Sequence, residues 1–252
     1  ARKEAAKAAN QRDKEAEAAA KSAVAPQRSW QLSATADWNL RVARRPMRLT
    51  ADLYGKYVPN LVPYVMDNLS VVYNPDAQAR AYATGLCLRL NAELVDSLES
   101  WVSLHLMQSR QEVEDDGLGW YPRPTDQRVS LKVFVQDYVP QIPWWRMSLT
   151  LVYASGAPVA SNYAPAAQPL RFPAYFRVDW GNTVQLSRFG GVGKWLGRRH
   201  VDDVQLSLQV FNLFDRRNVS SYLWVTDYDN RPYRVPSYLT ARQLNLRLTV
   251  LF

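Results

Sequence analysis

The sequence contains very little cysteine and histidine, the residues that most often reveal a disulfide framework or a metal site. Cys87 is the single cysteine, so no disulfide can form within the chain and cysteine usage does not identify the redox compartment. The histidines, His105 and His200, lie far apart, with no cysteine or carboxylate at metal-ligand spacing. We therefore expect Cys87 to be an ordinary small side chain on a strand, and we expect no zinc site.

Long apolar runs are also missing. Apolar residues make up 47% of the chain, yet no uncharged apolar run approaches the roughly 18 residues that a transmembrane helix needs. A helical membrane protein is therefore excluded. The first residues are charged but lack the apolar middle of a signal peptide. We expect the chain to be a mature protein, a fragment or a cytosolic protein.

No catalytic motif stands out. The stretch FGGVGKW at 189–195 resembles a phosphate-binding loop, but Arg188 occupies the place of the first glycine and Trp195 the place of the serine or threonine that holds magnesium. Neither a Ser-His-Asp triad nor a paired-carboxylate site can be argued from the sequence. We expect no enzyme activity, no catalytic residue, no metal site and no cofactor. The acidic runs at 112–117 and 227–230 lack EF-hand spacing and are expected to be solvated loop tips, with calcium left open.

The net charge of +8 suggests a polyanionic partner, either nucleic acid or lipopolysaccharide. The arginines argue against nucleic acid because they are spread one to a strand or placed at turns, without an RNA-binding or helix-turn-helix signature. We therefore expect no nucleic-acid partner, and lipopolysaccharide stays open as a polyanionic partner.

The first residues differ from the rest of the chain. Alanine, lysine, glutamate and glutamine dominate up to Val24, with pairs such as Glu17 and Lys21 four residues apart, and Pro26 follows. This composition predicts a helix. Because it has no leucine or isoleucine stripe, a solvated helix or frayed loop is favoured over a coiled-coil partner site. We treat 1–28 as a helical loop segment and 29–252 as a second unit.

From Trp30 onward, apolar and polar residues alternate with a period of two, as they do in a strand with one apolar and one polar face. Nine segments share this pattern: 30–42, 47–57, 85–94, 101–107, 128–138, 146–153, 176–186, 204–214 and 238–252. The connections distinguish a soluble β-sandwich from a membrane barrel. Short turns near 43–46, 95–100, 139–145 and 190–203 alternate with long connections at 70–78, 110–125, 154–173 and 215–240. Short turns on one rim and long loops on the other are typical of transmembrane antiparallel β-barrels.

In such a barrel the apolar face meets lipid and the polar face meets an aqueous lumen. We expect the lipid face to include Leu246, Leu248, Val129, Leu131, Val133, Leu149 and Leu151. The lumen face is expected to include Ser130, Thr150 and the candidate site residues Arg89, Glu93, Lys132, Arg177, Asp179, Asn245 and Arg247. Aromatic residues near strand ends, among them Trp30, Tyr57, Trp145 and Tyr153, fit an interfacial girdle.

Four stretches resemble one family. YATGLCLRLNAEL at 82–94, RPTDQRVSLKVFVQDYVP at 123–140, VFNLFDRRNVSSYLWV at 210–225 and VPSYLTARQLNLRLTVLF at 235–252 are similar to the C-terminal barrel half of TonB-dependent outer-membrane receptors, in particular those of Bacteroidetes-type bacteria. The resemblance covers about residues 29–252 and implies a 22-stranded barrel filled by an N-terminal plug. Nothing in the chain matches a plug or a TonB box. Nine strands are too few and odd in number, so the chain should be the last nine strands of a larger barrel.

The resemblance also implies an orientation and an assembly signal. If Phe252 lies at the periplasmic rim, counting back nine strands places Trp30 at the extracellular rim and puts segment 1–28 in an outer loop. The final strand resembles the signal read by the barrel-assembly machinery, carried by Leu246, Leu248, Val250 and Phe252. Because unpaired backbone groups are costly in lipid, both end strands should pair with strands outside 1–252.

Two classes of function remain open. One is active uptake of an unidentified nutrient ligand, energised through TonB. The other is a passive porin or an anchor that displays loops, and a soluble β-rich binding module is a distant third. Aromatic loop residues that could stack on a ligand are Trp120, Tyr121, Tyr163, Tyr222, Trp224 and Tyr228, although a girdle or loop-packing role is favoured for each. The expected partners are outer-membrane lipid and lipopolysaccharide, the remaining strands and plug, the TonB complex, the barrel-assembly machinery and a surface lipoprotein.

Overall fold

The computed structural model describes residues 26–42, 45–67, 70–95, 98–159, 169–191 and 201–251. These residues form one antiparallel sheet in which nine strands follow in the order β1-β2-β5-β6-β8-β9-β10-β11-β14, with the short β7 beside β6. The nine strands are β1 (Trp30–Val42), β2 (Arg45–Leu61), β5 (Ala79–Val95), β6 (Leu98–Val113), β8 (Val129–Val139), β9 (Ile142–Ala154), β10 (Tyr175–Gln185), β11 (Asp203–Phe211) and β14 (Gln243–Leu251). Each of the nine predicted segments forms one of these strands, which confirms the all-β prediction. The expected helix in 1–28 lies almost wholly outside the described residues.

Four further strands form two hairpins that the alternation did not predict. They are β3 (Tyr64–Asp67) with β4 (Ser70–Tyr73), and β12 (Val219–Thr226) with β13 (Pro232–Tyr238). Both lie within connections of the main sheet, so the segments 70–78 and 215–240 are partly strands and not simple loops. β7 (Tyr121–Pro122) and the 3-10 helix η1 (Leu186–Arg188) complete the described elements.

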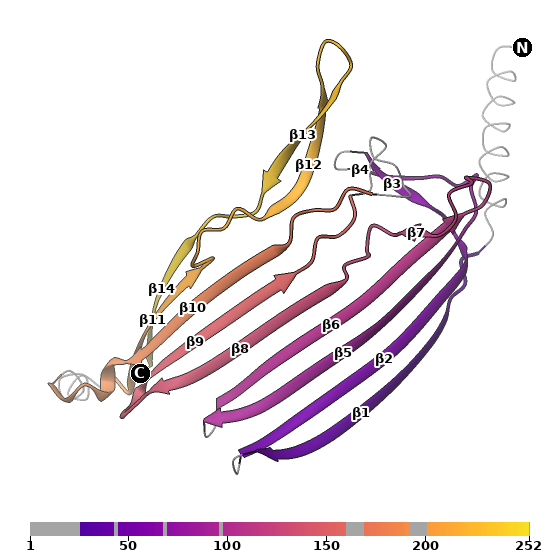
Figure 1. Cartoon of the computed structure of the whole chain (residues 1–252). Coiled ribbons are helices and arrows are strands. Elements are labelled where there is room, and N and C mark those ends of the chain that lie inside the picture. Colours follow the sequence, from indigo (N-terminus) through magenta and orange to yellow (C-terminus); the bar gives the residue numbers. More distant parts are fainter. Residues whose placement is uncertain are drawn as a thin grey trace, which may run out of the picture.

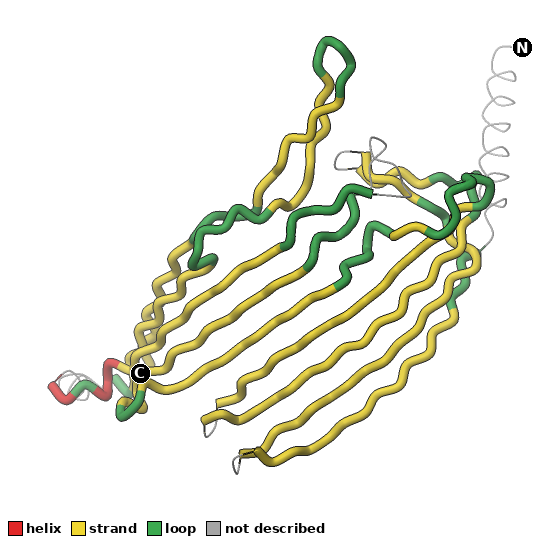
Figure 2. Tube along the Cα trace, in the orientation of Figure 1, coloured by secondary structure: helices red, strands yellow, loops and turns green. Residues whose placement is uncertain are grey.

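The long connections gather at one end of the sheet and the short turns at the other (Figures 1 and 2). The β2–β5, β6–β8, β9–β10 and β11–β14 connections share the first rim, where the β12–β13 hairpin projects away from the sheet. The β1–β2, β5–β6, β8–β9 and β10–β11 connections share the second. This arrangement confirms the predicted alternation of short and long connections, and we call the two ends the long-loop rim and the short-turn rim.

The strand register builds one apolar face and one polar face across all nine strands. Leu49 stands opposite Leu90, Leu90 opposite Val102, and Val102 opposite Val133. Further along, Leu151 pairs with Val178 and Leu208 with Leu246. This register places all seven side chains expected on the lipid side on the apolar face. A shift of one residue in any pairing would move that strand's side chains to the other face.

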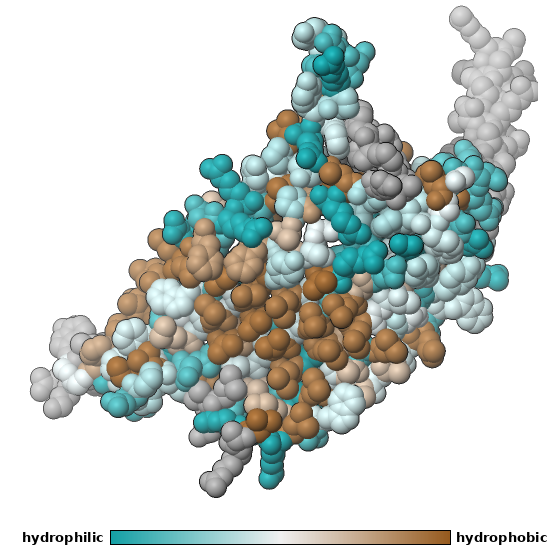
Figure 3. All heavy atoms as spheres, in the orientation of Figure 1, coloured by the Kyte–Doolittle hydropathy of each residue, from teal (hydrophilic) through white to brown (hydrophobic). Residues whose placement is uncertain are grey.

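The apolar face has no second layer against it. Leu244, Leu246 and Leu248 keep 73%, 68% and 61% of their surface exposed, and within the described part of the chain no other sheet packs on the nine strands. Figure 3 shows apolar residues filling the middle of the sheet, with polar residues toward both rims. A β-sandwich core is therefore excluded for these strands.

The sheet is open. Its order begins at β1 and ends at β14, and among the described residues these two strands do not pair with each other. They lie on opposite sides of the view in Figure 1. A small closed barrel of nine strands is thereby ruled out for this arrangement.

Candidate functional site

The polar face is the first candidate, and it collects every lumen-facing residue that the sequence predicts. Lys132 stands opposite Ser103 and Val152, and Asp179 opposite Thr150. At the far edge Asn245 and Arg247 stand opposite Gln209 and Ser207. The face is mixed and not wholly polar, because Trp101 and Phe134 also lie on it as a cross-strand pair.

Two of the predicted lumen-facing residues, Arg177 and Asp179, form an ion pair. The Arg177 Nε donates to Asp179 Oδ1 at 2.6 Å, and the guanidinium lies 5.4 Å from the centre of the Phe211 ring. Asp179 Oδ1 also accepts the backbone N–H of Asn212 at 2.8 Å. This pair therefore ties β10 to the end of β11, which leaves little of its charge available to a solute.

In the short-turn half of the polar face, the predicted charged residues are less fully paired. Arg89 donates from Nε to Asn91 Oδ1 at 2.8 Å and lies 5.1 Å over the Trp101 ring. Glu93 is exposed and stands directly opposite Glu99. Both glutamates line a hollow of about 450 Å³, whose polar lining also includes Asn39, Arg41, Arg48 and Asn91. Two carboxylates and two guanidinium groups share this hollow, so its lining favours neither sign of charge.

One aromatic residue of the polar face spans two strands. The Tyr54 ring from β2 lies 5.9 Å from the ring of His105 on β6, and a hydrogen bond of 3.0 Å joins Tyr54 Oη to His105 Nε2. The ring crosses Gly85 on β5, where an added Cβ would come within 2.5 Å of Tyr54 Oη. The missing side chain at Gly85 therefore makes room for this contact.

The aromatic loop candidates do not form one cluster. Trp120 packs on Tyr82 with ring centres 5.1 Å apart, and Tyr121 is buried in β7. Tyr222 stacks on Phe172 at 5.2 Å, and Arg234 lies 5.5 Å over its ring. Tyr228 is 96% exposed at the tip of the β12–β13 hairpin. Trp224 stands opposite Arg234 in the same hairpin, and Tyr163 lies outside the described residues.

Asparagines anchor that hairpin to the sheet. The Asn218 side chain accepts the Phe176 N–H at 3.0 Å and donates to the Phe176 carbonyl at 2.9 Å, as a neighbouring strand would. Asn212, with φ of 54°, donates from Nδ2 to the Arg216 carbonyl and accepts the Arg216 N–H. Asn and Asp tolerate this left-handed conformation better than other side chains. Neither asparagine was predicted as a site residue, although both lie in the VFNLFDRRNVSSYLWV stretch.

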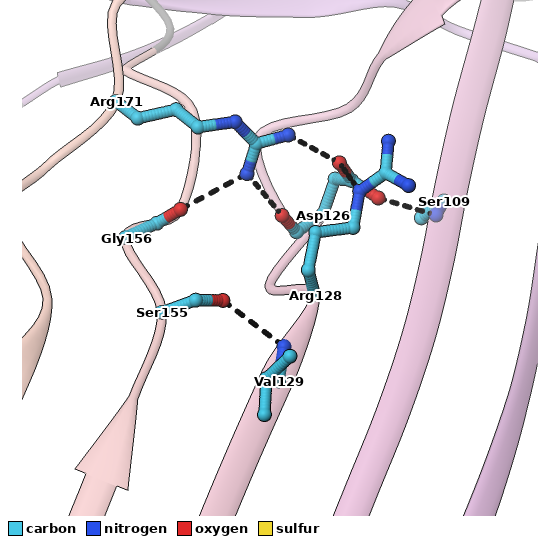
Figure 4. Close-up of polar contacts among 7 residues, drawn as sticks. All are labelled: Ser109, Asp126, Arg128, Val129, Ser155, Gly156 and Arg171. Atoms are coloured by element: carbon cyan, nitrogen blue, oxygen red, sulfur yellow. Dashed lines mark hydrogen bonds and ion pairs between the residues drawn. The ribbon is translucent and has the colours of Figure 1, made fainter.

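A buried ion cluster joins two of the long connections (Figure 4). Asp126, wholly buried, accepts from Arg171 at 2.6 Å, from Arg128 at 2.7 Å and from the Ser109 N–H at 2.7 Å. Arg171 also donates to the carbonyls of Asp126 and Gly156, both at 2.9 Å. We call these residues the loop clasp. It fixes the β6–β8 and β9–β10 connections to each other above the sheet.

The electrostatics of the loop clasp are well compensated. Burial acts to raise the pKa of Asp126, but the hydrogen bonds from Ser109, Arg171 and Arg128 outweigh it and lower the pKa below its ordinary value. A buried carboxylate is stable only when it is paired and hydrogen-bonded in this way. No periodic pattern marks Asp126, although it lies in the RPTDQRVSLKVF stretch.

The acidic loop tips cap their own turns. Asp116 Oδ1 accepts the Leu118 N–H, and Asp227 Oδ1 accepts the N–H groups of Asp229 and Arg231. Within the described ranges no three His, Cys, Asp or Glu side chains come together as a metal site would require.

Among the same residues, no helix has both the length and the apolar character needed to cross a bilayer.

The predicted assembly residues lie on the last strand. Leu246, Leu248 and Val250 belong to the apolar face of β14, opposite Leu208, Leu206 and Val204 of β11. Phe252 lies outside the described residues. Within the described part of the chain, only β11 pairs with β14.

No protein-family model and no curated protein matches the chain. Among solved structures, it is similar to the closed form of the ferric-catecholate import receptor Fiu from E. coli K12, with a TM-score of 0.58 and 16% sequence identity. The match covers 90% of this chain, which spans 27% of the length of that receptor. The likeness shows a receptor-barrel fold for the nine strands. It does not support the Bacteroidetes subtype that the sequence motifs resemble.

Proposed function

We propose that the nine strands form part of the wall of a larger closed barrel in the outer membrane of a Gram-negative bacterium. One observation carries this proposal: a mainly apolar face, interrupted by Asn182, runs across all nine strands, and many of its large side chains, among them Leu53, Leu149 and Leu246, are exposed. In water such a face would drive aggregation, whereas in a bilayer it is solvated by lipid. The polar face then lines an aqueous interior.

The barrel serves active uptake of a nutrient ligand through TonB, and these strands supply the C-terminal wall and several outer loops. The fold likeness to an import receptor supports this function. An N-terminal plug fills the lumen, the TonB complex acts on that plug, and the barrel-assembly machinery reads the last strand. A surface lipoprotein over the long-loop rim is a further proposed partner. We assign transport and not catalysis to the chain.

The long loops are the proposed entry for the ligand. The loop clasp and the asparagine anchors hold them in place, while Tyr228 at the hairpin tip stays open to solvent. A rigid base with an exposed tip is what a surface receptor needs to capture a solute before transport. The chemical class of the nutrient is left unassigned.

Ion conductance distinguishes energised uptake from a passive pore. The protein with its complete barrel is inserted into a planar bilayer in KCl solution. A plugged receptor conducts almost nothing until urea unfolds the plug, after which discrete current steps appear. Steady current before urea is added would instead mean an open porin, and this result would reject the uptake proposal.

A second measurement tests the TonB requirement. The purified protein is passed over immobilised periplasmic domain of TonB, and retention is expected for the complete protein. A closed barrel that is not retained would favour an anchor that displays its loops.

A further inference from the structure

The apolar face changes character toward the long-loop rim. On β5 the apolar side chains end at Leu86, and two steps further comes an aromatic and cationic row that crosses five strands. Its members stand opposite one another in the register: Trp30, Tyr57, Tyr82, Arg110 and Pro122. Arg110 therefore projects from the same face as the leucines that meet lipid.

A second row lies immediately beyond it. Arg80 and Glu112 stand opposite each other and form an ion pair of 2.6 Å. The ring centres of Trp120 and Tyr82 lie 5.1 Å apart, and the Arg80 guanidinium lies 5.6 Å from the centre of the Trp120 ring. Arg80 is therefore already held by an acid and a ring.

Arg110 is different. Its Nε atom is buried and has no hydrogen-bond partner among the described residues. A buried donor of this kind is costly unless an acceptor reaches it. The adjacent Glu112 carboxylate is engaged by Arg80, and Arg110 as a whole is half-buried. An anion from outside can therefore meet the accessible part of this cation, although the buried Nε itself lies out of its reach.

The height of Arg110 on the barrel identifies where that anion comes from. From Tyr82 to Ala92 a strand rises about 33 Å along its own axis, and a tilt of about 40° reduces this to about 25 Å of membrane height. Tyr82 and its neighbour Arg110 therefore lie at one boundary of the hydrocarbon layer. With the long loops outside the cell, this boundary belongs to the outer leaflet, where lipid phosphates lie.

Two shallow hollows lie below the row on the same face. One, of about 470 Å³, is lined by residues that include Leu32, Gly55, Tyr82 and Thr84. The other, of about 500 Å³, is lined by residues that include Leu53, Thr84 and Leu106. An added Cβ at Gly55 would meet nothing within 4 Å. The lining is mixed, with Gln31 and Lys56 in the first hollow and Gln108 and Arg128 in the second. The apolar side chains of both hollows offer contacts for alkyl chains directly beneath the cations.

We propose that Arg110, with Arg80 and Trp120 beside it, binds the phosphate group of an anionic outer-leaflet lipid whose alkyl chains lie in the two hollows. The site rests on the membrane placement proposed above, but not on transport. Arginine is well suited to phosphate because its planar guanidinium donates paired hydrogen bonds. Trp120 and Tyr82 provide the amphipathic rings that favour the headgroup region.

The test uses lipid A as the probe. The protein with its complete barrel is placed in phosphatidylcholine bilayers that contain bisphosphorylated lipid A or the same lipid without phosphates. Lipid that stays bound is counted by native mass spectrometry. We expect the wild-type protein to retain the phosphorylated form about tenfold more strongly, and Arg110→Gln to abolish this preference.

Arg146→Gln is the matched control, because Arg146 is exposed on the polar face of β9, opposite Tyr138 and Thr183. This variant should bind both lipids as the wild-type protein does. Equal binding of the two lipids by the wild-type protein, or an equal loss in both variants, overturns the site and leaves the barrel untouched. Failure of the wild-type protein to enter bilayers overturns the membrane placement as well.

Discussion

At the residue scale, the buried side chain of Asp126 holds two of the long connections together through Arg171. It accepts three hydrogen bonds while fully buried, so each partner would be left without its acceptor if the carboxylate were lost. We expect Asp126→Asn to weaken the local protection of the Ser109 amide by about 2 kcal/mol. Hydrogen exchange of the peptide containing Ser109 measures this, and faster exchange is the expected result.

The same amide should report on pH. The pKa of Asp126 is lowered in the folded protein, so the loop clasp contributes its full stability above the unfolded pKa of about 4 and loses it as pH falls through the lowered folded pKa. Protection at Ser109 should therefore hold down to about pH 4 and decline in stronger acid. Asp116→Asn is the control, because Asp116 lies in the β6–β8 connection outside the loop clasp and accepts the N–H of Leu118 in its own turn. An equal effect of both variants would show that the clasp does not hold the loops.

Two neighbouring residues of β14 can test which face of the sheet meets lipid. Leu248 lies on the apolar face of β14 and Thr249 on the polar face, opposite Leu206 and Gln205. Leu248→Arg should destabilise the barrel by about 2–4 kcal/mol if this face meets lipid. Thr249→Arg should cost much less, because its side chain meets water. Urea titration in lipid vesicles compares the two, and equal losses would argue against a lipid-facing side.

The sequence predicts the face of a strand residue but not the partner of a loop residue. The period of two placed Arg89, Lys132 and Arg247 on one face correctly, because alternation is a property of each strand alone. Asp126 and Arg171 are 45 positions apart and lie outside the long strands. Their contact depends on how two loops meet above the sheet, which no local pattern encodes.

At the element scale, the long strands were predictable and the short hairpins were not. Nine strands alternate over many residues, so their pattern is clear even without neighbours. β12 instead contains the apolar run Tyr222–Val225, and β13 contains two prolines, Pro232 and Pro236. Proline is depleted in strands, so the segment was interpreted as a loop. Among the described residues β12 and β13 pair only with each other, so both are edge strands, where proline is tolerated, and Asn218 anchors the base of the hairpin.

The hydrogen bonds between Asn218 and Phe176 lead to a prediction about the β12–β13 hairpin. Asn218→Ala removes both bonds to Phe176 and leaves the Phe176 N–H and carbonyl without these partners. We expect the β12–β13 hairpin to loosen by about 1–3 kcal/mol while the nine strands stay intact. Limited proteolysis after Arg231 measures the hairpin, and heat-modifiable gel mobility measures the barrel. Ser220→Ala, which removes a single exposed bond, is the control, and unchanged cleavage in Asn218→Ala would contradict the anchoring role.

At the scale of the whole molecule, the two rims should lie on opposite sides of the membrane. Asp116 and Asp229 belong to long connections, whereas Gln141, with φ of 66°, forms the tight β8–β9 turn on the other rim. We expect cysteines at 116 and 229 to react in intact cells with an impermeant thiol reagent, against a Cys87→Ala background. A cysteine at 141 should react only after the outer membrane is opened. The reverse pattern would mean the opposite orientation.

The open edges of the sheet give the last prediction. β1 and β14 each expose a row of backbone N–H and C=O groups on one side, and these are costly in hydrocarbon. In the assembled protein, amides of both strands should exchange as slowly as those of the central strands. The opposite result, rapid exchange at either strand, would mean that no further strand pairs there. A disulfide that formed readily between cysteines at 36 and 246 would show that the two edges close on each other.

The crossing of Tyr54 over Gly85 has an evolutionary consequence. Any side chain at position 85 would displace the ring that reaches His105, so a mutation at 85 alone removes a contact between β2 and β6 and adds nothing in its place. A smaller residue 54 would leave position 85 free to vary without this loss. Across related sequences, we therefore expect a side chain at position 85 to occur mainly where residue 54 is smaller than tyrosine.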